Sequence, residues 1–164
     1  MLRRWFRSEH ARRVDARPAL KRLDADAAIA LVGEFAAAVR ARDLEGVEAL
    51  FAPKLEAVML GRAAFRRAPV LARLNRARYL SYFSSWLFRC DLATYAIAVD
   101  DVLLASPERV RLSTCVRFPG NAAFAAAHPE PPRCDATVGL YRGRAVFLQM
   151  EFVPIPPNYR IDAR

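Results

Sequence analysis

Residues 28–53, "AIALVGEFAAAVRARDLEGVEALFAP", decide the fold because they join two helical patterns at a tight corner. In the first pattern, apolar side chains recur at intervals of three and four residues, which is typical of a helix with one buried face. These side chains are Ile29, Leu31, Val32, Phe35, Ala36 and Val39. The pattern predicts a helix over residues 25–41, with Asp24 or Asp26 as its N-cap.

The second pattern is shorter and begins directly after the first. Asp43 can cap a helix over residues 44–51 that turns Leu44, Val47, Leu50 and Phe51 inward, and Pro53 stops it. The segment therefore predicts two helices that meet at a corner.

The middle of the chain predicts one strand and one long helix. "LEAVML", residues 55–60, has the composition of a short strand, and the basic residues 62–69 follow it as a connector. Pro69 suits the first turn of a helix. We expect that helix to continue through Leu87 and to include "YLSYFSSWLFRC", residues 79–90, in its second half.

The last third of the chain predicts four long strands. We expect one strand or a bulged pair over residues 92–105 and the next strand over 109–118, where apolar and polar side chains alternate. Residues 134–143 and 145–154 predict a hairpin that turns at Gly143. Consecutive strands without helices between them pair antiparallel, so the fold class is α+β, with helices packed on a curved, mostly antiparallel sheet that forms a cone.

This order of elements resembles the NTF2-like superfamily, which includes SnoaL-like polyketide cyclases, ketosteroid isomerases and limonene epoxide hydrolases. The segment "ARDLEGVEALFAP" is most similar to the helix-helix corner of that family, and the resemblance covers roughly residues 24–153. It implies a cone-shaped NTF2-like (cystatin-like) fold, an apolar pocket between sheet and helices, and a homodimer formed through the outer face of the sheet.

The functional residues of the known enzymes are not found at the corresponding positions of this sequence. Where the isomerases place a carboxylate base, this chain has Met59, and residues 25–41 lack the tyrosine of their oxyanion hole. Arg89 and Asp91 resemble the Arg-x-Asp strand of the hydrolases, but our assignment puts them at the end of a helix. Catalysis is therefore left open; if it occurs, we expect acid-base chemistry of cyclase or hydrolase type without a metal.

The candidate site residues come from the strands and the long helix. On the strands, polar side chains alternate with apolar neighbours, so they share one face that lines the pocket or points outward. The catalytic candidates are Asp135, Glu151 and Asp101. The ligand-binding candidates are Tyr82 and Trp86 on the helix and Arg111, Arg117, Thr137 and Gln149 on the strands.

Composition limits the remaining alternatives. The chain of 164 residues is long enough for one domain, which we place at residues 24–154, between a basic arm (1–23) and an extended tail (155–164). The three cysteines show no metal-site spacing, and we expect no metal and no cofactor. With no signal peptide and no apolar run long enough to span a membrane, the sequence predicts a cytoplasmic protein.

The net charge of +9 is concentrated in two blocks, residues 1–22 and 62–78, which each carry +6. The sequence therefore supports two hypotheses. In the first, the domain binds a small, largely apolar molecule in a cavity of several hundred Å³. In the second, it is an interaction module whose basic arm and Arg62–Arg78 belt contact an acidic partner, an anionic membrane surface or nucleic acid.

Overall fold

The computed structural model describes residues 17, 19–62, 69–89, 91–127 and 129–152, so most of the basic arm and the whole of the tail lie outside the described residues. The helices are α2 (Ala25–Arg40), α3 (Leu44–Ala49), α4 (Arg76–Arg89) and α5 (Ala122–Ala127). The strands are β1 (Phe51–Arg62), β2 (Pro69–Asn75), β3 (Ala96–Ala105), β4 (Arg109–Arg117), β5 (Arg133–Tyr141) and β6 (Arg144–Phe152).

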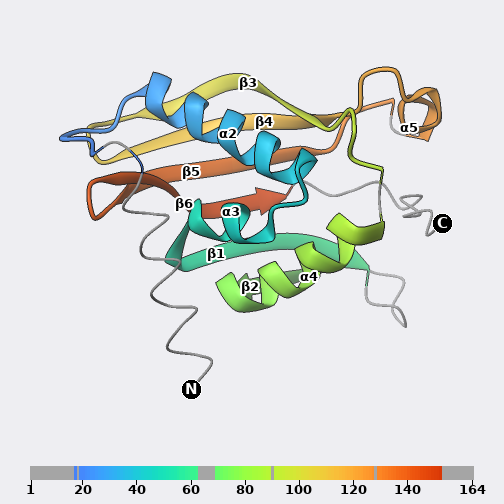
Figure 1. Cartoon of the computed structure of the whole chain (residues 1–164), viewed down its shortest axis with the longest axis horizontal. Coiled ribbons are helices and arrows are strands. Elements are labelled where there is room, and N and C mark those ends of the chain that lie inside the picture. Colours follow the sequence, from blue (N-terminus) through green and yellow to red (C-terminus); the bar gives the residue numbers. More distant parts are fainter. Residues whose placement is uncertain (1–16, 18, 63–68, 90, 128, 153–164) are drawn as a thin grey trace.

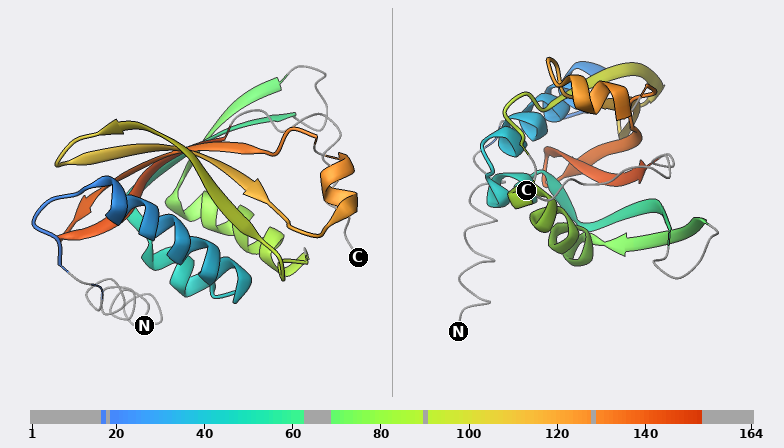
Figure 2. Two further views of the ribbon diagram at one scale, coloured as in Figure 1. Left: turned by 90° about the horizontal axis from the view of Figure 1, so that it is seen from above. Right: turned by 90° about the vertical axis from the view of Figure 1, so that its right-hand side faces the viewer.

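The six strands form one sheet in the order β2-β1-β6-β5-β4-β3. Every neighbouring pair is antiparallel except β1 and β6, which run parallel because the chain crosses between them through β2, α4 and three further strands. Helices α2, α3 and α4 lie on one side of the sheet, and the sheet curves around them (Figures 1 and 2). The α+β class and the curved, mostly antiparallel sheet are therefore confirmed.

The helix-helix corner forms as the sequence predicts. The Asp24 carboxylate accepts a hydrogen bond from the Ala27 amide at 2.8 Å, and Asp43 caps α3 by accepting one from Gly46 at 2.9 Å. Helix α2 buries five of the six predicted apolar residues, but Ile29 is 40% exposed. The buried stripe is thus centred on Leu31 and Phe35 rather than on Ile29.

The helix predicted from Pro69 is wrong over its first turns. Residues 69–75 form β2, which pairs with β1 from Arg62 opposite Pro69 to Glu56 opposite Asn75. Proline can begin a strand because its missing N–H matters least there. Helix α4 starts at Arg76, and Asn75 caps it by accepting a hydrogen bond from the Arg78 amide at 3.0 Å.

Three smaller differences concern the other elements. Strand β1 extends over Phe51–Arg62 rather than 55–60, and α5 lies in a segment that the sequence predicted as a loop. The four late strands and the hairpin are confirmed, and the hairpin turns at Arg142 and Gly143, which both have positive φ (50° and 69°). This backbone conformation matches the twist of the flanking strands.

The packed part of the chain extends further toward the N-terminus than residue 24. Leu23 is 3% exposed and belongs to the core, and the Leu20 amide donates a hydrogen bond to the Gly143 carbonyl at 2.7 Å. The Arg17 guanidinium donates to the carbonyls of Ala145 (2.7 Å) and Ala49 (3.1 Å). Part of the basic arm is therefore docked on the domain.

No helix among the described residues is both long enough and apolar enough to cross a membrane.

Phe35 is the side chain through which α2 holds both α4 and the sheet. It is 2% exposed, and its ring centre lies 5.7 Å from that of Phe83 on α4 and 5.7 Å from that of Phe147 on β6. We predict that Phe35→Ala lowers the free energy of unfolding by about 3–5 kcal/mol. Chemical denaturation measures this, with Ile29→Ala on the exposed side of the same helix as the control; equal losses in the two variants would contradict this packing.

Candidate functional site

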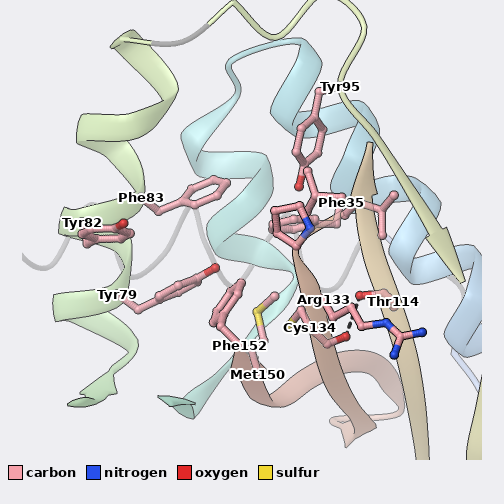
Figure 3. Close-up of a pocket in the computed structure, with 13 residues that line it drawn as sticks. Phe35, Tyr79, Tyr82, Phe83, Tyr95, Thr114, Arg133, Cys134, Met150 and Phe152 are labelled. Carbon is pink, nitrogen blue, oxygen red and sulfur yellow. Dashed lines mark hydrogen bonds between the residues drawn. The ribbon is translucent and has the colours of Figure 1, made fainter. Parts of the chain in front are cut away.

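A cavity of about 100 Å³ lies between α4 and the side of the sheet that faces the helices (Figure 3). Its wall is predominantly apolar and comes from α2, α4, four strands and the segments next to them. The lining residues are Phe35, Tyr79, Tyr82, Phe83, Tyr95, Ile97, Thr114, Val116, Pro132, Arg133, Cys134, Met150 and Phe152.

The periods of helix and strand explain why these residues meet. Tyr79, Tyr82 and Phe83 are three and four positions apart, so they share the side of α4 that faces the sheet. On β4 and β6 the lining residues are two positions apart, as expected for side chains on one face of a strand.

Aromatic rings occupy most of the space inside the cone. The Tyr79 ring centre lies 5.9 Å from that of Phe83, 5.5 Å from that of Phe51 and 5.9 Å from that of Phe152. The cavity that they leave is smaller than the several hundred Å³ expected from the sequence. Its volume is close to that of engineered cavities of about 150 Å³ that hold benzene.

Tyr79 places a polar group in this apolar space. The side chain is 2% exposed, and its hydroxyl points away from α4 into the space enclosed by the aromatic side chains (Figure 3). Burial, with a smaller contribution from the nearby Cys134, raises the pKa of Tyr79 well above its usual value, so the phenol stays protonated at neutral pH.

The other polar groups of the wall are neutral or face away. The Thr114 hydroxyl donates a hydrogen bond to the Cys134 carbonyl at 2.7 Å, and burial raises the pKa of the Cys134 thiol. Arg133 points away from the aromatic side chains (Figure 3), and its guanidinium lies 3.9 Å from Asp100. The described lining residues include no carboxylate and no imidazole. This wall can bind a neutral molecule, but it offers no group that would exchange a proton near neutral pH.

The structure places one of the sequence-predicted site residues, Tyr82, in the cavity wall. It is 45% exposed, so the wall reaches solvent beside it. Trp86 lies one turn further along α4, but its side chain is outside the described residues.

The predicted polar residues of the strands lie on the opposite face of the sheet. Arg111 binds two of them, because its Nη2 lies 3.0 Å from Asp135 Oδ2 and 2.8 Å from Glu151 Oε2. Gln149 donates to the other oxygen of Glu151 at 2.8 Å, and Thr137 is the cross-strand partner of both Arg111 and Gln149. Arg111, Asp135, Glu151 and Gln149 form a network outside the cone, and Thr137 lies beside it, so none of the five belongs to the cavity wall.

The two remaining candidates also lie away from the cavity wall. Arg117 Nη2 is 3.8 Å from Asp100, and its Nε donates to the Cys115 sulfur at 3.3 Å. Asp101 is exposed on β3, where its carboxylate accepts a hydrogen bond from the next amide, that of Val102. Asp91, from the hydrolase comparison, is likewise exposed and accepts one from the Ala93 amide, as expected in a turn.

Sequence reasoning missed Tyr79 as a site residue and treated it as core. Its helical spacing with Phe83 did show that it faces the sheet, and its burial confirms that. The spacing could not show that Tyr79 lines a cavity, because this depends on the positions of side chains from several different elements.

The described arginines of the Arg62–Arg78 belt are partly neutralised within the chain. Arg73 lies 3.2 Å from Glu56, and Arg76 lies 2.9 Å from Glu48. Arg78 is exposed, and residues 63–68 lie outside the described residues. Two of these charges are therefore already paired with acids of the domain.

The fold is similar to those of several solved structures at low sequence identity. An NTF2-like protein of unknown function from Silicibacter pomeroyi is 19% identical, with 78% of this chain and 92% of that chain covered and a TM-score of 0.53. An NTF2-like protein from Cytophaga hutchinsonii is 14% identical, with 79% and 97% covered and a TM-score of 0.54. A de novo designed protein with a curved β-sheet is 13% identical, with 76% and 97% covered and a TM-score of 0.51.

A scan of protein-family models and a search of curated proteins found no match. The structural similarities confirm the resemblance seen in the sequence: the chain has the NTF2-like fold. A designed protein shares this architecture, so the fold alone does not specify a function, and any function has to be argued from the site.

The buried phenol and thiol predict that the protein loses stability at alkaline pH. Because the folded-state pKa values of Tyr79 and Cys134 are raised, the folded protein keeps protons that the unfolded chain releases. The loss of stability begins as the pH rises through the pKa values of the unfolded chain, about 8.5 for cysteine and 10 for tyrosine. From there up to its folded-state pKa, each group lowers the free energy of unfolding by about 1.4 kcal/mol per pH unit. Urea denaturation between pH 8 and 11 measures this slope.

Tyr79→Phe should make the alkaline slope of the free energy of unfolding shallower by about 1.4 kcal/mol per pH unit above pH 10, because the variant lacks the phenol. Tyr82→Phe, which changes an exposed tyrosine on the same helix, should leave the slope as in the wild type. Equal slopes for wild type and Tyr79→Phe would show that the Tyr79 hydroxyl reaches solvent.

Proposed function

We propose that this protein binds a small, largely apolar molecule in the cavity between α4 and the sheet. The observation that carries the proposal is an apolar cavity that remains open in an otherwise closely packed core. Protein interiors rarely contain voids of this size, because each one forfeits packing energy. A bound molecule would restore those contacts.

The chemistry of the wall favours binding over acid-base catalysis. Among the described lining residues, the groups that titrate are phenols, one thiol and Arg133, and burial holds the Tyr79 phenol and the Cys134 thiol protonated. The carboxylates predicted as catalytic residues, Asp135 and Glu151, are bound to Arg111 on the far face of the sheet. A general base must reach the proton that it removes, and these two groups do not line the cavity.

Binding can be tested with toluene, whose size suits the cavity. We predict saturable binding by the intact chain in an NMR titration, with chemical-shift changes centred on Phe83, Val116 and Phe152. Val116→Phe should weaken this binding at least about tenfold, because the added ring occupies the cavity. Val102→Phe, the same substitution at a position 37% exposed on β3, is the control and should bind as the wild type does.

Ile97→Phe provides a second filled variant should Val116→Phe fail to fold. Toluene binding that persists in a folded filled variant, or that is absent from the wild type, would contradict the proposal.

We further propose that two copies pair through the outer face of the sheet. Leu103 and Leu104 on β3 are 47% and 55% exposed, and Leu104 is the cross-strand partner of Arg111 on that face. Apolar side chains beside a charged network are typical of an interface with a polar rim. The interaction of the basic arm and the Arg62–Arg78 belt with an acidic partner, a membrane surface or nucleic acid stays a prediction, and much of both segments lies outside the described residues.

Sedimentation tests the pairing. The wild type should sediment at twice the chain mass of 18.4 kDa, and Leu104→Glu should sediment as a monomer. Phe88→Glu, at a position 69% exposed on α4, should leave the mass unchanged. A monomeric wild type would exclude the pairing.

A further inference from the structure

Three acidic side chains form a row across the outer face of the sheet. Ser113 on β4 is the cross-strand partner of both Asp101 on β3 and Asp135 on β5. Asp135 is in turn the partner of Glu151 on β6. Cross-strand partners lie on the same face of a sheet, so Asp101, Asp135 and Glu151 form one acidic row. Arg111, bound to two of them, neutralises one charge and leaves the row negative.

Two arginines form a basic group next to the acidic row on the same face. Arg133 precedes Asp135 by two residues on β5, which corresponds to about 7 Å along the strand. Arg117, at the end of β4, approaches the same carboxylate as Arg133 does, that of Asp100. The two distances are 3.8 Å and 3.9 Å, longer than a hydrogen bond. One carboxylate between two guanidinium groups leaves the basic group positive.

We infer that the acidic row of one copy contacts the basic group of a second copy, and that these contacts set the alignment of the two paired sheets. The inference rests on the pairing proposed above. It adds the charged contacts that fix how the two copies are aligned, and it makes the pairing sensitive to salt.

The symmetry of a dimer explains why two regions of opposite charge are needed. In a two-fold interface each residue of one copy meets its counterpart's neighbourhood twice, so a surface of a single sign would repel itself. An axis that lies in the interface midway between the acidic row and the basic group brings each region opposite the other. An axis through the middle of the acidic row would bring like charges together, which disfavours that alignment.

The charged side chains remain accessible for contacts between copies. The side chains of Arg117 and Arg133 are 56% and 60% exposed, and that of Glu151 is 42% exposed although it is bound within its own chain. Leu103 and Leu104 lie exposed on the strand that carries one end of the acidic row. Burial of the leucines favours association in general, whereas the charges select one alignment.

Two charge-reversed variants of the full chain test the inference by sedimentation. In the first variant, Arg117→Glu and Arg133→Glu make both regions negative. In the second variant, Asp101→Lys and Glu151→Lys make both regions positive. Each variant alone should sediment at the chain mass of 18.4 kDa, because like charges face each other. An equimolar mixture should sediment at twice that mass, because regions of opposite charge meet again.

Controls separate the effect of the charges from a loss of structure. The second variant keeps Asp135, so Arg111 retains a carboxylate partner, and far-UV circular dichroism establishes that each variant is folded. Arg78→Glu, at an exposed position on α4, should leave the mass of the wild type unchanged. Should a reversed variant fail to fold, Arg117→Gln with Arg133→Gln removes the same positive charges and should weaken pairing about tenfold.

The salt dependence of the wild type provides a second measurement. Dissolved ions screen contacts between exposed charges, so raising sodium chloride from 50 to 500 mM should weaken pairing about tenfold. Pairing through apolar contacts alone would be unchanged or stronger at the higher salt concentration.

The outcomes separate this inference from the proposed pairing. If the wild type and both reversed variants are all dimers, the sheets pair without these charges, so the pairing stands and the inference is wrong. If both variants are monomers and their mixture stays monomeric, the inferred alignment is wrong. A monomeric wild type would contradict the pairing and the inference together.

Discussion

The contact between a curved sheet and straight helices is the constraint on which the rest of this structure depends. Helix α2 meets the sheet through Phe35, which contacts Phe147, and α4 meets it through Tyr79, which contacts Phe51 and Phe152. Large aromatic rings fill much of the space between the helices and the concave face of the sheet. Where these rings do not meet, the cavity remains, and the Tyr79 hydroxyl occupies part of its wall.

The two faces of the sheet differ in the charge of their side chains. The inner face carries neutral side chains against the helices, whereas the outer face holds Arg111 between Asp135 and Glu151. Asp135 and Glu151 are cross-strand partners, so their like charges would repel each other without the arginine. With these charges outside the cone, the cavity has a low polarity in which a single hydrogen bond can discriminate between ligands.

The sequence was sufficient for the fold class because helical and strand periods are local properties. The caps at Asp24 and Asp43 and the late hairpin followed from short patterns. The strand at Pro69 was missed because Pro69 also suits a helix start, and only its pairing with β1 decides between the two. For the site, alternation separated the two faces of each strand, but it could not show which face lines the cavity. That depends on where the helices pack: Tyr82 lines the cavity, whereas the strand carboxylates lie on the far side of the sheet.

The central claim is that an apolar cavity persists beside the Tyr79 hydroxyl. Crystals of the intact protein exposed to xenon gas test this directly, because xenon enters dry apolar cavities. The account predicts one strong xenon peak enclosed by Tyr79, Phe83 and Phe152. No xenon at that position, with the space filled by a side chain, would contradict the account.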